Sequence, residues 1–262
     1  MDLADALESR AAELAYGALA EMYRDPFWEA RFGERGRRFS GEDGLYHVRY
    51  LVEALRAGSP ETLIRYARWL QSVLTTRGMC TRHLAENFER LADTIRASVS
   101  GAADAEPALS YLASATQALQ YPEGPARAVQ DAAEAIAARV EAQAPAGAAA
   151  DAATAVSVAN VANVANVANV AGERAGGAGH VADPRTVLSY LADAIALGRP
   201  EVFVDHLAWS AGFLEQRGVS REELGQRLSD VRGALEILPA AARDEALGLV
   251  EAALVRIRER AS

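Results

Sequence analysis

The chain contains no lysine and a single cysteine, Cys80, among its 262 residues. One thiol excludes a disulfide within the chain and any zinc site built from several cysteines, and it is typical of a reducing compartment. The first residues are acidic and lack a cationic start followed by an apolar core. No stretch approaches the ~20 apolar residues that span a bilayer. We therefore expect a cytoplasmic protein with no membrane partner.

Positive charge is also scarce, because 27 basic residues, all of them arginine, stand against 36 acidic ones for a net charge of −9. This balance argues against nucleic acid as a partner. The sequence also lacks a serine–histidine–aspartate context, a phosphate-cradling glycine loop, a dinucleotide fingerprint and a zinc signature. We therefore expect a protein that is not an enzyme, with no metal site. A less favoured alternative gives Tyr46, His47 or Cys80 an acid–base or thiol role.

Strand patterns are absent as well. Apolar residues recur every three or four positions nearly everywhere outside the centre, which predicts an all-α fold. The centre, 141–183, consists almost wholly of Ala, Gly, Val and Asn and includes VANVANVANVANVAG at 158–172. A three-residue period moves Val by about 60° per repeat around a helix, so no apolar stripe forms. We interpret 141–183 as a low-complexity linker between a helical domain, 1–140, and a second helical segment, 184–262.

The two helical segments share an internal repeat at an offset of 140 positions, as Tyr50 and Tyr190 illustrate. Further matching pairs are Ala54/Ala194, Gly58/Gly198, Pro60/Pro200, Trp69/Trp209, Leu74/Leu214, Gly78/Gly218 and Leu84/Leu224. The glycines predict helix ends, and the prolines predict the first turn of the next helix. We expect the two tryptophans to lie in a core or an interface.

The second segment is expected to be a truncated repeat of residues 44–140, because residues 1–49 have no counterpart after the linker. Its expected helices are 186–197, 201–217, 221–236 and 240–259. Ser220 and Glu223 predict a capping box at the start of the third of these helices. Cys80 and His83 stand at the same positions in the first copy, where a cap is the favoured interpretation and a reactive thiol the alternative.

Residues 35–58 carry a further pattern, formed by Arg35, Gly36, Asp43, Tyr46, Arg49, Ala57 and Gly58. It resembles the chromophore helix of the phycobiliproteins, the family of phycocyanin and allophycocyanin, which reads R-G…C-x-R-D-x-x-Y-x-x-R…A-G. The stretches at 15–26 and 98–119 are similar to flanking helices of that family. The resemblance covers about residues 10–120 and implies a globin-like, all-helical domain.

Two departures from the family pattern bear on function. Ser40 stands where the family has the cysteine that forms a thioether to an open-chain tetrapyrrole, so the resemblance implies that covalent attachment is lost. Glu42 stands where the family has an arginine that pairs with a bilin propionate, and it would repel that carboxylate. Asp43 remains, at the position that in the family accepts hydrogen bonds from the pyrrole nitrogens.

The residues that we assign to a non-covalent pocket are Asp43, Arg35, Arg37, Arg38, Arg49, Tyr46, Ser40 and His47. A guanidinium suits a ligand carboxylate, and a neighbouring aspartate accepts from ligand N–H groups. A histidine inside a helix of a globin-like fold also suggests haem or a metal, although no histidine pair has ligand spacing. The favoured alternative is that Ser40 and Asp43 cap a helix and the arginines form solvated ion pairs.

Two functional hypotheses follow from this sequence. The first is a non-enzymatic, phycobiliprotein-like module that works as a regulator, sensor or scaffold through a protein partner or self-association, with no cofactor. The second is a module that binds a bilin, haem or another acidic hydrophobic ligand without a covalent bond.

Overall fold

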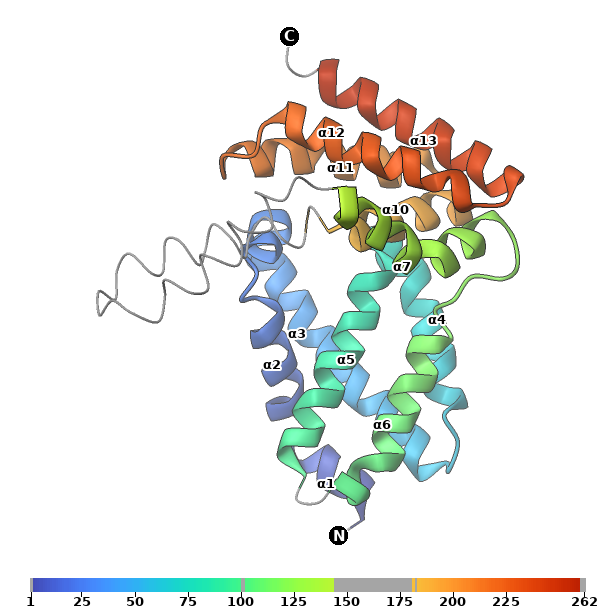
Figure 1. Cartoon of the computed structure of the whole chain (residues 1–262). Coiled ribbons are helices and arrows are strands. Elements are labelled where there is room, and N and C mark those ends of the chain that lie inside the picture. Colours follow the sequence, from blue (N-terminus) through green and yellow to red (C-terminus); the bar gives the residue numbers. More distant parts are fainter. Residues whose placement is uncertain (1, 100–101, 144–180, 182, 260–262) are drawn as a thin grey trace. The chain divides into compact units, whose positions relative to one another are not determined.

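The computed structural model of the chain describes residues 2–99, 102–143, 181 and 183–259 (Figure 1). Helices and short connections make up these residues and no strand occurs among them, which confirms the predicted all-α class. Apart from its ends, the expected linker 141–183 lies outside the described residues. None of the described helices is long and apolar enough to cross a membrane.

The chain forms two compact units, unit 1 from Met1–Gln120 and unit 2 from Tyr121–Ser262. The helices of unit 1 are α1 (Leu3–Ser9), α2 (Ala11–Met22), α3 (Pro26–Arg56), α4 (Glu61–Thr75), α5 (Thr81–Ser98) and α6 (Ala102–Gln117). Those of unit 2 are α7 (Pro125–Gln143), α10 (Pro184–Leu197), α11 (Pro200–Glu215), α12 (Arg221–Ala234), the 3₁₀ turn η1 (Leu235–Ile237) and α13 (Ala240–Glu259).

The boundary between the units differs from the expected one, which placed residues 121–140 in the first domain. The reason is packing, because α7 lies against α10, α12 and α13 within unit 2. Its buried side chains include Val129, Ile136 and Val140. The low-complexity stretch therefore follows α7, the first helix of unit 2, rather than marking the boundary itself.

The start of helix α3 is set by its N-cap residue and a proline in its first turn. Asp25 is the N-cap, with its carboxylate accepting a hydrogen bond of 2.8 Å from the backbone N–H of Phe27, and Pro26 occupies the first turn. Ser40 and Asp43 lie in the interior of this helix, so the interpretation of these two residues as a helix cap is wrong. Two helical segments of α3 meet at a kink at Gly33, whose non-helical conformation (φ 60°, ψ −163°) favours glycine.

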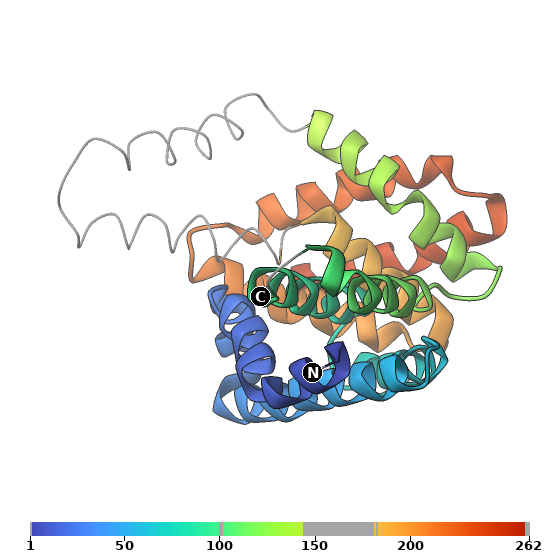
Figure 2. The ribbon, with the colours of Figure 1, turned by 90° about the horizontal axis from the view of Figure 1, so that it is seen from below.

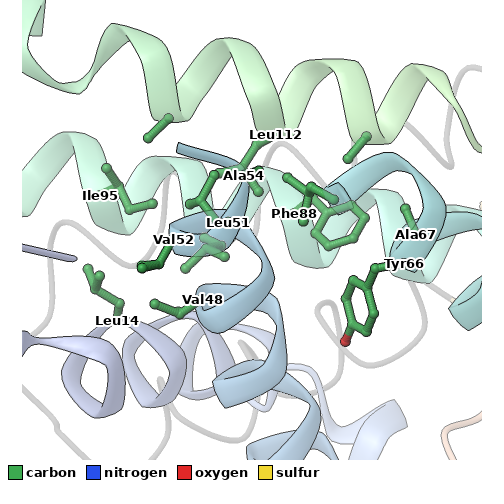
Figure 3. Close-up of a cluster of buried hydrophobic side chains, with 14 of the residues drawn as sticks. Leu14, Val48, Leu51, Val52, Ala54, Tyr66, Ala67, Phe88, Ile95 and Leu112 are labelled. Atoms are coloured by element: carbon green, nitrogen blue, oxygen red, sulfur yellow. The ribbon is translucent and has the colours of Figure 1, made fainter. Parts of the chain in front are cut away.

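Unit 1 has its core where α2 to α6 meet around the second half of α3 (Figure 3). Leu14, Leu51, Phe88 and Ile95 are fully buried there. Burying side chains of this size stabilises the fold by roughly 1.5–3 kcal/mol each. Helices α5 and α6 lie side by side, as two views show (Figures 1 and 2). The core therefore fixes the second half of α3 firmly, between α2 on one side and α4 and α6 on the other.

The helix ends that the repeat predicts are present in both units. The glycines after the helices have positive φ angles, namely Gly58 (64°), Gly78 (87°), Gly198 (60°) and Gly218 (84°). At the first pair, the Ser59 N–H donates to Ala54 O at 3.1 Å, and the Arg199 N–H donates to Ala194 O at 3.0 Å. This is the bond of a Schellman cap. The same backbone hydrogen bond thus closes equivalent helices 140 residues apart.

A stacked ring pair also recurs at equivalent positions. Tyr50 stacks on Tyr66 with ring centroids 4.1 Å apart, and Tyr190 stacks on His206 with centroids 3.6 Å apart. Each pair joins the helix that ends at the first glycine of its copy to the next helix. The predicted capping box of Ser220 and Glu223 is confirmed, since each residue's side chain accepts from the backbone N–H of the other.

The described part of unit 2 holds five α-helices, one more than expected. In unit 1, α2 packs against α3 and α5, and in unit 2, α7 packs against α10 and α12. Because α10 and α12 stand at the repeat positions of the end of α3 and of α5, α7 has the neighbours in unit 2 that α2 has in unit 1.

Candidate functional site

A cleft of about 550 Å³ lies in unit 1, between the middle of α3 and the turn that follows α4. Three of the residues assigned to a pocket from the sequence line it, namely Arg35, Ser40 and Asp43. The volume falls within the ~300–1,000 Å³ of small-molecule sites. The cleft is thus a candidate ligand site at the place where the sequence predicted one.

Aromatic rings form much of the cleft wall. Trp28 and Phe32 line it from the first part of α3, with ring centroids 5.8 Å apart in a stacked arrangement, and Phe39 lines it from beyond the kink. Trp28 is held from behind by an edge contact with His83, at a centroid distance of 4.8 Å. Leu74 and Met79 complete the apolar lining. Such a wall suits a flat, apolar ligand surface.

The kink at Gly33 creates the space for this wall. It changes the direction of α3 so tightly that a Cβ on Gly36, in the cleft lining, would lie 2.2 Å from the Cβ of Phe32. No larger residue fits at Gly36 without moving the helix. Two glycines with different roles therefore shape one wall of the cleft.

The polar groups of the cleft carry both signs of charge. Arg35 and Arg77 line it and are exposed, while Asp43 is half-buried. The Arg35 guanidinium carbon lies 5.4 Å from the centroid of the Phe39 ring. Neither arginine forms a salt bridge with a carboxylate of the described residues. Both guanidiniums are thus available to an acidic group of a ligand.

Asp43 is the carboxylate at this site. Burial raises the pKa of the Asp43 carboxyl above its usual value, the positive charge of Arg77 opposes that rise, and the negative charge of Glu42 adds to it. One basic residue on the other side of the cleft, Arg77, therefore limits the rise in the pKa of Asp43.

His47, one turn after Asp43 on α3, lies outside the cleft and in the core. Its Nδ1 shares a buried hydrogen bond of 2.8 Å with the Tyr66 hydroxyl. Burial lowers the pKa of His47 to about 3 and raises the pKa of Tyr66, to which the charge of Asp43 also contributes. His47 is thus a neutral structural residue, and the structure does not place it in the predicted pocket.

The other predicted pocket residues also lie outside the cleft lining. Arg37 donates to Glu29 at 3.0 Å, Arg38 lies 3.8 Å from Glu42, and Arg49 lies 3.2 Å from Glu53. Tyr46 is half-exposed and does not line the cleft. A helix turns by about 100° per residue, so four arginines spread over 35–49 cannot all face one side. These four residues and His47 therefore do not line this cleft.

Sequence reasoning missed several cleft residues, above all Arg77. The repeat identified Arg77 and Gly78 as a helix end and gave no hint that the turn faces the middle of α3. The aromatic residues carried a better signal, because Trp28 and Phe32 are four positions apart and so share a helix face. Among the described residues, no group of three or more His, Cys, Asp or Glu side chains is placed to hold a metal ion.

Cys80 and His83 form the cap of α5, as the favoured interpretation of the repeat predicted. The Cys80 N–H donates to His83 Nδ1 at 3.3 Å, and the His83 N–H lies 3.0 Å from Cys80 O. Both side chains are buried. The pair therefore sets the start of α5 behind Trp28 rather than facing the cleft.

Comparison of the chain with models of protein families, with curated proteins and with solved structures gives no match.

Proposed function

We propose that the protein is a non-enzymatic helical module whose first unit binds a flat, apolar, acid-bearing small molecule without a covalent bond. The observation that carries this proposal is the cleft beside Asp43, with an aromatic wall and two guanidiniums at its polar side. A bilin, haem or another acidic hydrophobe has these properties. The cleft favours this hypothesis over the one that rests on protein contacts alone.

The resemblance to the phycobiliproteins supports the same reading of unit 1 as a globin-like domain. Asp43 and Arg35 line the cleft at the positions that the resemblance singles out. Ser40 also lines it, and its hydroxyl cannot form the thioether of the family. Unit 2 is then a second, tethered copy of the helical repeat, in which regulation or partner binding takes place.

Fluorescence titration tests the proposal. Biliverdin, haemin and 8-anilinonaphthalene-1-sulfonate are added in turn to the full chain, and quenching of Trp28 is followed in a background where Trp69 and Trp209 are phenylalanine. Saturable quenching by at least one of the three probes is expected. The absence of saturable binding for all three would contradict the proposal.

Two matched variants locate the binding. Arg35→Gln removes a cleft guanidinium and should weaken binding about tenfold, because a charged hydrogen bond contributes about 1.5 kcal/mol or more. Arg49→Gln removes an exposed arginine of the same helix that is paired with Glu53 outside the cleft, and it should leave the affinity unchanged. Equal effects of the two variants would place the ligand elsewhere.

The protein-contact hypothesis has an observation of its own. Trp69 is 59% exposed and Tyr46 is 50% exposed, so Trp69 does not lie in the core. Trp69 lies beside the Tyr50–Tyr66 stack, with its ring centroid 6.1 Å from that of Tyr66. Exposed tryptophan and tyrosine side chains are typical of protein-binding surfaces. We therefore propose the aromatic patch of Tyr46, Tyr50 and Trp69, which lies around the buried Tyr66, as a docking face for self-association.

Sedimentation analysis over a range of protein concentrations tests this second candidate. A concentration-dependent dimer is expected, and Trp69→Ala should weaken it by about 30-fold or more if the indole is a hot spot worth about 2 kcal/mol. Val255→Ala, at an apolar residue of α13 that is also exposed, serves as the control. A purely monomeric wild-type chain would rule out self-association through the patch.

A further inference from the structure

The charges around Asp43 are unusual for a site that would take an acidic ligand. Its carboxylate lines the same cleft as Arg35 and Arg77. On its own helix, Glu42 adds a second negative charge. On α4, the charge of Asp43 contributes to the raised pKa of Tyr66. Tyr66 is already hydrogen-bonded to the neutral His47. Arg77, in the turn after α4, is the one basic residue that stabilises the ionised form of Asp43 among the groups that shift its pKa.

An acidic ligand group at Arg77 would compete for that stabilising charge. It would bring a negative charge close to the Asp43 carboxylate and, in the same step, occupy the guanidinium that favours ionisation. A bulky apolar ligand would also displace water from the half-buried carboxylate, which favours its neutral form. All three effects act in one direction, so the site binds an anion best when Asp43 is protonated.

We propose that the cleft takes up its anionic ligand together with one proton, and that Asp43 is the group that receives this proton. The proton comes from the solvent and forms an O–H bond on the carboxylate, and no other bond changes. The inference rests on the proposed function of the cleft and adds a regulation to it. Ligand affinity then depends on pH through a residue of the chain rather than through the ligand.

Proton linkage fixes the sign of the effect. Between the pKa of Asp43 in the free protein and its higher pKa in the complex, affinity falls as pH rises, by up to about tenfold per pH unit. Below both values the carboxyl is protonated in either state, and the affinity no longer changes. The cleft therefore loads at low pH and releases its ligand as pH rises.

Isothermal titration calorimetry on the full chain tests the proposal with 8-anilinonaphthalene-1-sulfonate, whose sulfonate stays ionised throughout. The titration is run at about pH 5, 6 and 7, each in two buffers with different ionisation enthalpies, so that the difference in heat gives the number of protons taken up. The expected result is an uptake of up to one proton with an affinity that falls as pH rises. Binding with no proton uptake at any of the three pH values would overturn the inference and leave the proposed function intact.

Two variants assign the proton to a residue. Asp43→Asn mimics the protonated carboxyl, so it should bind the probe at least as tightly as the wild type at about pH 7, with no proton uptake and no pH dependence. Glu42→Gln, the neighbouring exposed carboxylate outside the cleft lining, should retain the uptake. Equal uptake by Asp43→Asn and the wild type would overturn the role of Asp43. Because the wild-type proton uptake is decisive alone, the test stands even if a variant folds poorly.

A wild-type chain that does not bind the probe at all refutes the inference. It also removes one support of the proposed function, which biliverdin and haemin test separately.

Discussion

His47 is a histidine that the fold keeps uncharged. It is 2% exposed and packs against Phe88 and Tyr66, with its Nδ1 in the hydrogen bond to the Tyr66 hydroxyl. In the unfolded chain the same side chain titrates near 6.5, whereas in the folded chain its pKa is about 3. Between these two values unfolding takes up a proton, so acid favours the unfolded state.

The stability of unit 1 should therefore fall on acidification below about pH 6.5, by about 1.4 kcal/mol per pH unit from this residue alone. His47→Gln removes the titration and should flatten the slope by one proton, while lowering the stability at neutral pH through the altered packing. Urea unfolding at about pH 7 and 5 measures both effects. Trp209→Phe in the background restricts the fluorescence to Trp28 and Trp69 of unit 1. Identical pH slopes with and without His47 would refute the assignment.

At the residue scale, the sequence predicted some site residues and not others for a geometric reason. Arg35, Ser40 and Asp43 were found because the resemblance supplied a pattern along one helix. Arg77 comes from a turn more than thirty positions away, and nothing in its local sequence tells which helix that turn faces. His47 was assigned to the pocket because a histidine inside a helix of a globin-like fold suggests haem or a metal, whereas in the structure its side chain lies in the core.

The kink of α3 is the element on which the cleft depends. Trp28 and Phe32 precede Gly33, while Arg35, Phe39 and Asp43 follow it. A straight helix would place these groups along a continuous spiral instead of around one hollow. The conformation of Gly33 is thus part of the site although the residue does not line the cleft.

Gly33→Ala should destabilise unit 1 by about 1–3 kcal/mol, because an alanine at φ 60°, ψ −163° is strained. Space is not the cause, since nothing lies within 4 Å of the added Cβ. Chemical denaturation measures the change, and probe binding should weaken with it. Gly248→Ala in the interior of α13 is the matched control, with ordinary helical φ and open space, and should stabilise its helix by about 0.5–1 kcal/mol. Equal effects at the two positions would show that Gly33 carries no strain.

Helix ends were more predictable than the kink. The glycines at 58, 78, 198 and 218 follow apolar periodicity and precede a proline or a cap, so their role as stops was readable from the sequence. Gly33 and Gly36 sit within a continuous helical pattern, where glycine is compatible with either a regular turn or a break. The choice between them depends on the packing of Trp28 and Phe27 against α5, which local sequence does not report.

At the scale of the whole molecule, the chain divides after Gln120 and not within its low-complexity stretch. Composition marks 141–183 as different from the rest of the chain, but a change in composition is not a change in packing. Helix α7 is alanine-rich like the stretch that follows it, and its partners α10, α12 and α13 lie beyond that stretch in the sequence. Contacts across so long a separation leave no periodic signal.

Fragments of the chain test this division. Residues 184–262 lack α7 and leave its partner surface on α10 uncovered, so we expect a poorly folded or aggregating fragment. Residues 121–262 include α7 and should show a cooperative thermal transition by circular dichroism. Residues 1–120 are the companion fragment and should retain the Asp43 cleft and its probe binding. A sharp melt of 184–262 alone would contradict the importance of α7.

The sole sulfhydryl of the chain belongs to Cys80, the buried N-cap of α5, and the first turn of that helix carries His83, which contacts Trp28. A maleimide reaches Cys80 after that turn opens and not before, so the labelling rate of the unmodified protein reports how often the turn frays. Ligand occupancy that braces Trp28 should slow the alkylation. The rate of Cys80 alkylation thus measures the opening of this turn in the unmodified protein, because the chain has no second thiol and no lysine amine that would also react.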